Sequence, residues 1–316
     1  MTPDGRATLP DGVEPADLTP MLRACYLLGR LSPLRRYCHR FVGGYLARHP
    51  DKAVVLGRMF GLPTLLDLRE TMERTIFLAG AVNRREIALM RWALRSVHRP
   101  VVFDIGANVG NHSVGLRDIA GTIYAFEPHP LLHQRLAWTI AHNRVDNVVP
   151  LKLALSDRSG HGWLKTDNRG IERGALARKD KGGLPVEVTM GDAFAADRQL
   201  SGLDLVKIDV EGHEPQVLRG LAATIERFRP IVVFERYVTS GGHAMAALHR
   251  LLSGYMLIGT RKRRAMVGAP PGVRLERFDD ARAYAAVLAV PQERLADILG
   301  RRWSYLATTS NRPVAG

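Results

Sequence analysis

Residues 101–116, VVFDIGANVGNHSVGL, constrain the fold of this chain more than any other stretch. The run VVFDI at 101–105 has the composition of a buried strand, and a loop with Gly106, Asn108 and Gly110 follows it. Glycine lets a backbone turn tightly and approach a ligand closely. A strand, such a loop and a following helix together indicate the first unit of a doubly wound α/β sheet.

The rest of the chain from residue 99 alternates between strand and helix patterns. We expect further strands at residues 121–128, 147–157, 204–212 and 230–236, and helices at residues 130–144 and from Pro215. Residues 254–261 and 284–291 are expected to form a final strand pair that closes one edge of the sheet antiparallel. The pattern predicts one domain at 99–316, a mostly parallel doubly wound sheet with an antiparallel edge strand.

Residues 1–98 show a different sequence pattern. Residues 1–20 are rich in Pro, Asp and Thr and are expected to be a flexible tail. Residues 21–98 show apolar side chains at helical spacing, with Thr19 and Pro20 as a helix start, and predict a helical extension or cap. Arginines cover the other faces of these helices. We favour the solvated side of packed helices, with peripheral membrane contact as the alternative.

The net charge of +14 and a pI near 10.3 raise the question of an anionic partner. The densest basic run, residues 261–264, is short, so an unspecialised basic surface is favoured over nucleic-acid binding. No secretory signal or membrane-length apolar run is found, and the cysteines, Cys25 and Cys38, form no disulfide or metal pattern. A cytoplasmic location is expected. The oligomeric state is left open.

The glycine loop and the next strand predict a nucleotide-like cofactor. Glu127 ends that strand about 21 residues after Gly106, the spacing of an acid that binds ribose hydroxyls. Asn108 and Asn111 occupy positions where a dinucleotide loop requires glycine. Asp104, expected at the mouth of the loop, would repel a pyrophosphate and attract the ammonium and sulfonium groups of S-adenosylmethionine. S-adenosylmethionine is therefore the predicted cofactor.

A second polar stretch, LVKIDVEGHEPQVLRG, follows the fourth strand and carries Lys207, Asp209, Glu211 and His213. Charged groups at the end of an apolar strand are costly unless paired or used. A Lys–Asp ion pair and a helix start beside Glu214 would explain part of the cluster structurally. Because strand ends of this fold hold the chemistry, we interpret the cluster as the catalytic side of the site.

Five ordered motifs, DIGANVGNHS, AFEPHP, LALSD, LVKIDVEGHEPQVLRG and VVFER, resemble those of the FkbM family of S-adenosylmethionine-dependent methyltransferases. The resemblance covers about residues 100–236. It implies a class I Rossmann-like methyltransferase fold and O-methylation of a hydroxyl on a sugar, polyketide, lipid-linked or other small metabolite. The strand end DVEG lacks the Asn/Asp-Pro-Pro pattern of amino-methylating enzymes, and both cysteines lie outside the core, which disfavours carbon methylation of pyrimidines.

The residues leave several roles open. His213 by its ordinary pKa, and Asp209 and Glu211 by position, are general-base candidates, and Lys207 would orient the acceptor or lower the pKa of a neighbour. Carboxylates there, together with Glu235, could instead hold Mg²⁺, a metal role that is not favoured.

The second wall of the cofactor site is assigned to Ser156, Asp157 or Asp192, with Asp157 retained as a cofactor residue. Asp104→Ala is expected to abolish cofactor binding and leave the fold intact. A nicotinamide-dependent oxidoreductase and a non-catalytic cofactor- or nucleic-acid-binding module remain the alternative functions.

Overall fold

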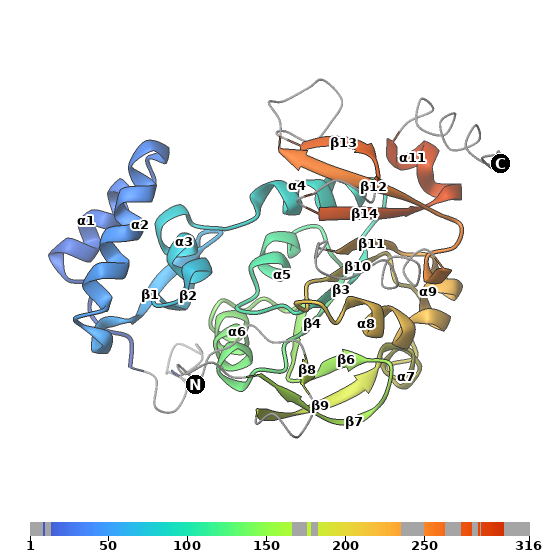
Figure 1. Ribbon diagram of the computed structural model, residues 1–316, viewed down its shortest axis with the longest axis horizontal. Helices are drawn as coiled ribbons and strands as arrows, with labels where there is room; N and C mark the ends of the chain where they lie inside the picture. The colour runs from blue at the N-terminus through green and yellow to red at the C-terminus, as the bar shows by residue number, and fades with distance from the viewer. Residues whose placement is uncertain are drawn as a thin grey trace.

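The computed structural model describes residues 9, 14–165, 176–177, 183–234, 250–262, 273–279, 284 and 286–299. In these residues the main sheet has eight strands in the order β13-β12-β14-β11-β10-β3-β4-β5 (Figure 1). Their bounds are β3 (Val101–Ile105), β4 (Thr122–Phe126), β5 (Val148–Leu151), β10 (Leu205–Ile208), β11 (Ile231–Phe234), β12 (Tyr255–Lys262), β13 (Val273–Arg277) and β14 (Ala286–Pro291).

The pairing of these strands confirms a mostly parallel, doubly wound sheet. Strands β5, β4, β3, β10 and β11 pair in parallel. The expected antiparallel pair is present as β12 and β14, but β14 is inserted between β11 and β12 and not placed at the edge. The edge strand on this side is β13, which also pairs antiparallel. The order reverses at β3, so the loop after β3 lies at the switch point, where such sheets bind ligands.

Helices cover both faces of the sheet. The period of two along β3 sends Val102 to one face and Phe103 to the other, where each joins a separate apolar cluster. The first cluster includes side chains of α4 (Arg84–Ala93), α5 (Asn111–Leu116), α6 (Pro130–His142) and α11 (Leu295–Leu299), the last following the short helix η3 (Gln292–Arg294). The second includes side chains of α7 (Gly191–Asp197), α8 (Glu214–Gly220) and α9 (Ala222–Phe228).

A second, smaller sheet lies at the bottom of Figure 1. It contains β6 (Ala154–Ser156), β7 (Gly160–Leu164), β8 (Leu176–Ala177) and β9 (Leu184–Met190), in the order β6-β9-β7-β8. The single strand expected at 147–157 is therefore wrong. The chain leaves the main sheet after Leu151 and enters the second sheet at Ala154, so that β6 pairs with β9. No helix or strand was expected at residues 158–203.

The N-terminal segment contains helices α1 (Pro20–Leu28), α2 (Ser32–Leu46) and α3 (Thr71–Ala79) and the short helix η1 (Pro50–Lys52). Thr19 caps α1 as predicted, accepting a hydrogen bond from the N–H of Leu22 (3.3 Å). The expectation of helix throughout is wrong at β1 (Val54–Met59) and β2 (Leu62–Asp67), which form an antiparallel hairpin. Its signal was the alternation of VVLGRM and a two-residue turn at Phe60 and Gly61, both at positive φ.

The same segment is tied to the sheet domain through buried contacts. Buried side chains of α1, α2, β1, β2 and α3 belong to the apolar cluster that also holds side chains of α5, α6 and β3. Glu73 of α3 forms a buried ion pair with Arg135 of α6 at 2.8 Å. Of the expected tail, residues 9 and 14–20 are described, and the N–H of Ala16 donates to the carbonyl of Val54. In the described part of the chain, no helix is both long and apolar enough to cross a bilayer.

Candidate functional site

The loop between β3 and α5 is held in a shape that only glycine permits at two positions. Gly106 has φ +78°, and a Cβ there would lie 1.9 Å from the carbonyl oxygen of Asp209. Gly110 has φ +90°, and a Cβ there would lie 2.5 Å from the side chain of Leu136. Asn108, also at positive φ (54°), accepts a hydrogen bond from the N–H of Val109. The loop is therefore pressed against the end of β10 and against α6.

Lys207, on the neighbouring strand β10, binds this loop through the carbonyl of Gly106. It is the register partner of Asp104 on the neighbouring strand, and both side chains are buried. Its Nζ donates to the carbonyl of Gly106 at 2.9 Å and lies 3.2 Å from Oδ1 of Asp104 and 3.6 Å from Oδ2 of Asp209. Burial acts to lower the pKa of Lys207, but the charges of Asp104 and Asp209 outweigh it and raise that pKa. Lys207 is therefore a permanently charged support that joins β3, β10 and the loop.

Asp104 lies beneath the loop and not at its mouth, which corrects the sequence-based expectation. Its side chain is fully buried, and Oδ2 accepts hydrogen bonds from the N–H (3.1 Å) and hydroxyl (2.6 Å) of Ser113. Burial acts to raise its pKa, but the charge of Lys207 keeps that pKa below its ordinary value. Removing Asp104 would leave a buried lysine short of a partner, so the expectation that Asp104→Ala leaves the fold intact is not supported.

Glu127 is brought to the glycine loop, as predicted. One carboxylate oxygen accepts from the N–H of Asn108 at 2.8 Å, and the other accepts from the N–H of His129 at 2.9 Å. Burial raises the pKa of Glu127 to about 7, against the lowering effect of these two hydrogen bonds. The carboxylate therefore links the end of β4 to the loop at the switch point.

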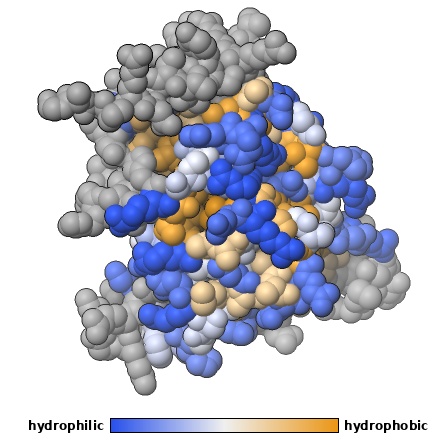
Figure 2. All heavy atoms as spheres, turned by 90° about the vertical axis from the view of Figure 1, so that its right-hand side faces the viewer, coloured by the Kyte–Doolittle hydropathy of each residue, from blue (hydrophilic) through white to orange (hydrophobic). Residues whose placement is uncertain are grey.

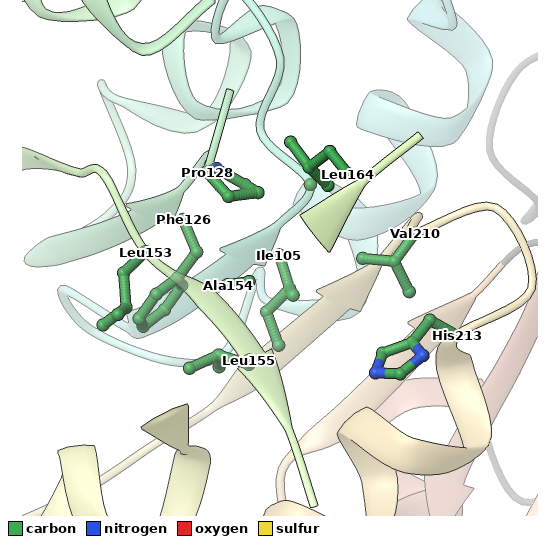
Figure 3. A pocket seen from close by; sticks show the side chains of 10 residues that line it. Ile105, Phe126, Pro128, Leu153, Ala154, Leu155, Leu164, Val210 and His213 are labelled. Carbon is green, nitrogen blue, oxygen red and sulfur yellow. The ribbon is translucent and has the colours of Figure 1, made fainter. Parts of the chain in front are cut away.

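An apolar pocket opens beside Gly106 (Figure 3). The space inside it, including the part that is open to solvent, is about 330 Å³. Phe126, Leu153 and Pro128 line one side and Val210 and His213 the other. The complete lining is Ile105, Gly106, Phe126, Pro128, Leu153, Ala154, Leu155, Leu164, Val210 and His213. Of these residues only Gly106 and His213 were predicted from the sequence, although several of the others lie at strand ends or two residues beyond them.

His213 lies at the edge of this pocket and is hydrogen-bonded to Ser156. Its Nε2 lies 2.9 Å from the Ser156 hydroxyl. Burial lowers the pKa of His213 to about 4, so the ring is neutral near pH 7. A neutral ring with so low a pKa, one nitrogen of which is already hydrogen-bonded, is a weak general base.

Asp157 and Asp192, the other candidates for the second wall, both have structural partners. Asp157 forms an ion pair with Arg219 of α8 at 2.9 Å. Asp192 accepts hydrogen bonds from the N–H and hydroxyl of Thr224 and from the N–H of Ala223, at the start of α9. Neither lines the pocket beside Gly106. The role of Asp157 in cofactor binding stays a prediction.

The turn after β10 orients the remaining polar residues. Asp209 is partly exposed, with 27% of its side chain accessible. Its main-chain N–H donates a hydrogen bond to the carbonyl of Ile105. Glu211 has φ +53° and is half-buried. Glu214, whose pKa burial raises, accepts from the N–H groups of Val210 and Gly212 and so closes the turn, as the structural interpretation required. Asp209 is linked to the loop through Lys207, whose Nζ lies 3.6 Å from Oδ2 of Asp209 and donates to the carbonyl of Gly106.

The described residues provide no set of ligands for the Mg²⁺ alternative. Among the residues that the structure describes, no group of three His, Cys, Asp or Glu side chains is arranged to hold a metal ion. Glu235, the third carboxylate of that hypothesis, lies outside the described residues.

Two polar residues that the sequence analysis missed extend the cluster toward the N-terminal segment. Glu86 of α4 lies 3.7 Å from Nε2 of His112, which is buried at the start of α5. Burial acts to raise the pKa of Glu86, but the charges of His112 and Lys207 lower it overall. Asn111 exchanges hydrogen bonds with both main-chain groups of Val82. No sequence signal linked α4 to the loop, because the contact depends on tertiary packing.

The strand order, the inserted antiparallel strand and the glycine loop at the switch point define a Rossmann-like fold of the class I methyltransferase type. Residues 104–255 match the methyltransferase FkbM domain. The chain therefore contains an FkbM methyltransferase domain, the family that the sequence motifs resembled.

Individual relatives have low sequence identity to this chain. The chain is 27% identical over 133 residues to the hexuronic acid methyltransferase AglP of Haloferax volcanii, an alignment that covers 42% of this chain and 54% of AglP. The chain thus spans about half the length of this curated relative. A crystal structure of methyltransferase FkbM from Methylobacillus flagellatus is 15% identical, with 68% of this chain and 52% of that chain covered and a TM-score of 0.40. M. jannaschii TYW2 in complex with AdoMet is 20% identical, with 75% and 84% covered and a TM-score of 0.36.

Proposed function

We propose that this protein transfers a methyl group from S-adenosylmethionine to a hydroxyl group of a sugar, with a hexuronic acid as the first candidate. The observation that carries the proposal is the glycine loop at the switch point, within the residues that match the FkbM domain. The hexuronic acid specificity of the relative AglP suggests the substrate class. The acceptor is thus a small molecule or a small glycan.

The residues around the loop fit S-adenosylmethionine. Gly106 and Gly110 let the loop pack against Asp209 and Leu136, where a Cβ would clash, and Glu127 offers carboxylate oxygens to ribose hydroxyls. The apolar pocket beside Gly106 suits the flat adenine ring. The single positive charge of Lys207 is opposed by Asp104 and Asp209, with Glu86 and Glu127 near. This acidic surrounding favours a cationic methionine group and disfavours a pyrophosphate, which argues against a nicotinamide cofactor.

The mechanism follows from which side chains are free to meet an acceptor. S-adenosylmethionine, when bound, supplies an electrophilic methyl carbon that a hydroxyl oxygen attacks in line. Asp209 accepts the hydroxyl proton, since its carboxylate is partly exposed at the carboxyl end of β10. Lys207 and Asp104 position Asp209 and Gly106. Because the side chains of Lys207 and Asp104 are buried, they do not touch the acceptor. His213 contributes to the pocket wall and not to proton transfer.

Calorimetric titration with S-adenosylmethionine, S-adenosylhomocysteine and NADH tests the cofactor. We expect binding of the first two and none of NADH. Binding of NADH alone would replace the proposal with a dehydrogenase, and binding of none would leave the loop as an ordinary turn.

A methylation screen then tests the acceptor, with glucuronic and galacturonic acid, their glycosides and matching neutral hexoses. We expect methyl transfer to the acids. Asp209→Asn should lower kcat by at least about a hundredfold while cofactor affinity stays within a few-fold, as for loss of a general base. Activity that survives EDTA would leave the divalent metal without a role.

A further inference from the structure

The helical hairpin α1–α2 exposes an unusual amount of apolar surface. Six of its large side chains are between 37% and 65% accessible, and we call them the hairpin surface: Leu27, Leu28, Leu31, Leu34, Tyr37 and Phe41. In the rest of the described chain, only Leu9, Leu56 and Leu131 are comparably exposed. The hairpin lies at the left end of Figure 1, beyond α3 and β1–β2. Figure 2, which shows the opposite end, has hydrophilic residues interleaved with hydrophobic ones.

Packing within the protein does not account for this surface. Helix α2 already buries Cys38, Val42 and Leu46 at a spacing of four, which is the stripe that meets the rest of the N-terminal segment. Leu34, Tyr37 and Phe41 form a second stripe at spacings of three and four on another side of α2. Leu27, Leu28 and Leu31 extend it over the turn between the helices. The second stripe therefore faces outward.

The charge around the hairpin surface has one sign. Between Asp17 and Asp51 the sequence contains no acidic residue and six arginines: Arg23, Arg30, Arg35, Arg36, Arg40 and Arg48. Within the described residues, none of these arginines lies in an ion pair. Arg36 instead lies 4.7 Å from the ring centre of Tyr37, and Arg30 lies 4.6 Å from that of Tyr26. The arginines therefore keep their charge available to an anionic partner.

We propose that the hairpin surface docks on an anionic lipid membrane. Apolar side chains flanked by arginines, with an aromatic side chain at the boundary, match a bilayer interface, where the apolar groups enter the acyl boundary and the guanidinium groups bind phosphates. Each arginine near an anionic leaflet adds attraction. A nucleic-acid surface is polar, so the leucines and Phe41 would gain nothing there. Helix α2 has 15 residues and lies on the bilayer without crossing it.

Co-sedimentation with vesicles tests the proposal without reference to methyl transfer. The full chain is mixed with vesicles of phosphatidylglycerol and phosphatidylcholine in equal parts, or of phosphatidylcholine alone. One variant removes the apolar stripe, Leu34→Ser with Tyr37→Ser and Phe41→Ser. A second reverses charge, Arg36→Glu with Arg40→Glu. The matched controls are Leu56→Ser and Arg198→Glu, which change exposed residues of the same kinds elsewhere. Unchanged circular dichroism shows that each variant is folded.

We expect binding to the anionic vesicles and at least about tenfold weaker binding to neutral ones, since each basic residue near the surface contributes. Each hairpin variant should weaken anionic binding at least about tenfold, while the controls match the unaltered protein. Absence of binding to both vesicles, or unchanged binding by both hairpin variants, would overturn the proposal. A dimer in sedimentation velocity that the apolar variant abolishes, without vesicle binding, would assign the surface to a second copy of the chain and overturn it as well.

Discussion

At the scale of single residues, Lys207 explains why the strand end is polar. A buried ammonium group costs several kcal/mol unless it is paired, and here it has two carboxylates and a carbonyl. These partners lie on β3, directly after β10 and in the glycine loop, so the charge that is costly to bury also fixes the loop against the end of β10. The sequence-based alternatives of ion pair and functional cluster are thus compatible.

Glu127 gives the clearest prediction at this scale. Its pKa of about 7 means that about half of the carboxyl groups are protonated at pH 7. The N–H groups of Asn108 and His129 donate to this carboxylate. In the proposed complex the ribose hydroxyls would also donate to its ionised form. Affinity for S-adenosylmethionine should therefore fall roughly tenfold from pH 8 to pH 6, as the ionised fraction falls. Calorimetric titration across this range measures it.

Glu127→Gln is the control for this prediction. It retains one acceptor oxygen, binds the cofactor more weakly at pH 8, and should show little change in affinity between pH 8 and pH 6. An affinity of the unaltered protein that rises toward pH 6 would show that the protonated carboxyl group is the form that binds.

At the scale of elements, the sequence predicted those parts that depend on local pattern. The glycine loop, the parallel strands and the Thr19 cap follow from composition and spacing within a few residues. The β1–β2 hairpin was missed because the surrounding helical periodicity was extended across it. The position of β14 inside the sheet, and the burial of Asp104, depend on which strands become neighbours. No local pattern encodes that, so the acid was placed at the mouth of the loop.

The glycine loop yields a prediction with a matched control. Gly106→Ala requires a left-handed conformation, which costs roughly 1–2 kcal/mol, and its Cβ would also collide with the carbonyl of Asp209. Gly61→Ala has a similar φ of +84° but meets nothing within 4 Å. Urea denaturation should show about 1–2 kcal/mol lost for Gly61→Ala and more for Gly106→Ala. Only Gly106→Ala should lose cofactor binding, and equal effects of both variants on binding would contradict the collision.

The ion pair between α3 and α6 is a second element-scale case. Glu73 accepts from Arg135 and from the N–H of Asp67, and burial raises its pKa to about 7. Glu73→Ala leaves the buried guanidinium group of Arg135 without its carboxylate partner, so we expect a loss of about 3–5 kcal/mol in urea denaturation. Glu73→Leu combined with Arg135→Met should recover part of this loss, because only the Asp67 N–H then remains unpaired. A double variant no more stable than Glu73→Ala would mean that the unpaired guanidinium group of Arg135 is not the cause of the loss.

At the scale of the whole molecule, the N-terminal segment and the sheet domain share one apolar cluster. Ile76 and Phe77 of α3 belong to the same cluster as Val102 of β3 and Val114 of α5. Gly115 approaches α4 so closely that a Cβ there would lie 2.9 Å from the side chain of Ile87. The boundary expected near residue 98 therefore crosses a continuous core. The contacts of Asn111 and Glu86 place this interface directly behind the glycine loop.

The shared core predicts how the chain responds to division at that boundary. A fragment of residues 99–316 would expose the apolar face of α5 and α6 that the N-terminal segment covers, at a cost of about 25 cal/mol for each Å² exposed. We expect this fragment to aggregate or to bind a hydrophobic dye, whereas the full chain unfolds in one cooperative transition by circular dichroism and tryptophan fluorescence. If the fragment instead unfolds cooperatively and binds S-adenosylmethionine like the full chain, the N-terminal segment is an independent unit. The contacts through Glu86 and Asn111 would then make no contribution to shaping the glycine loop.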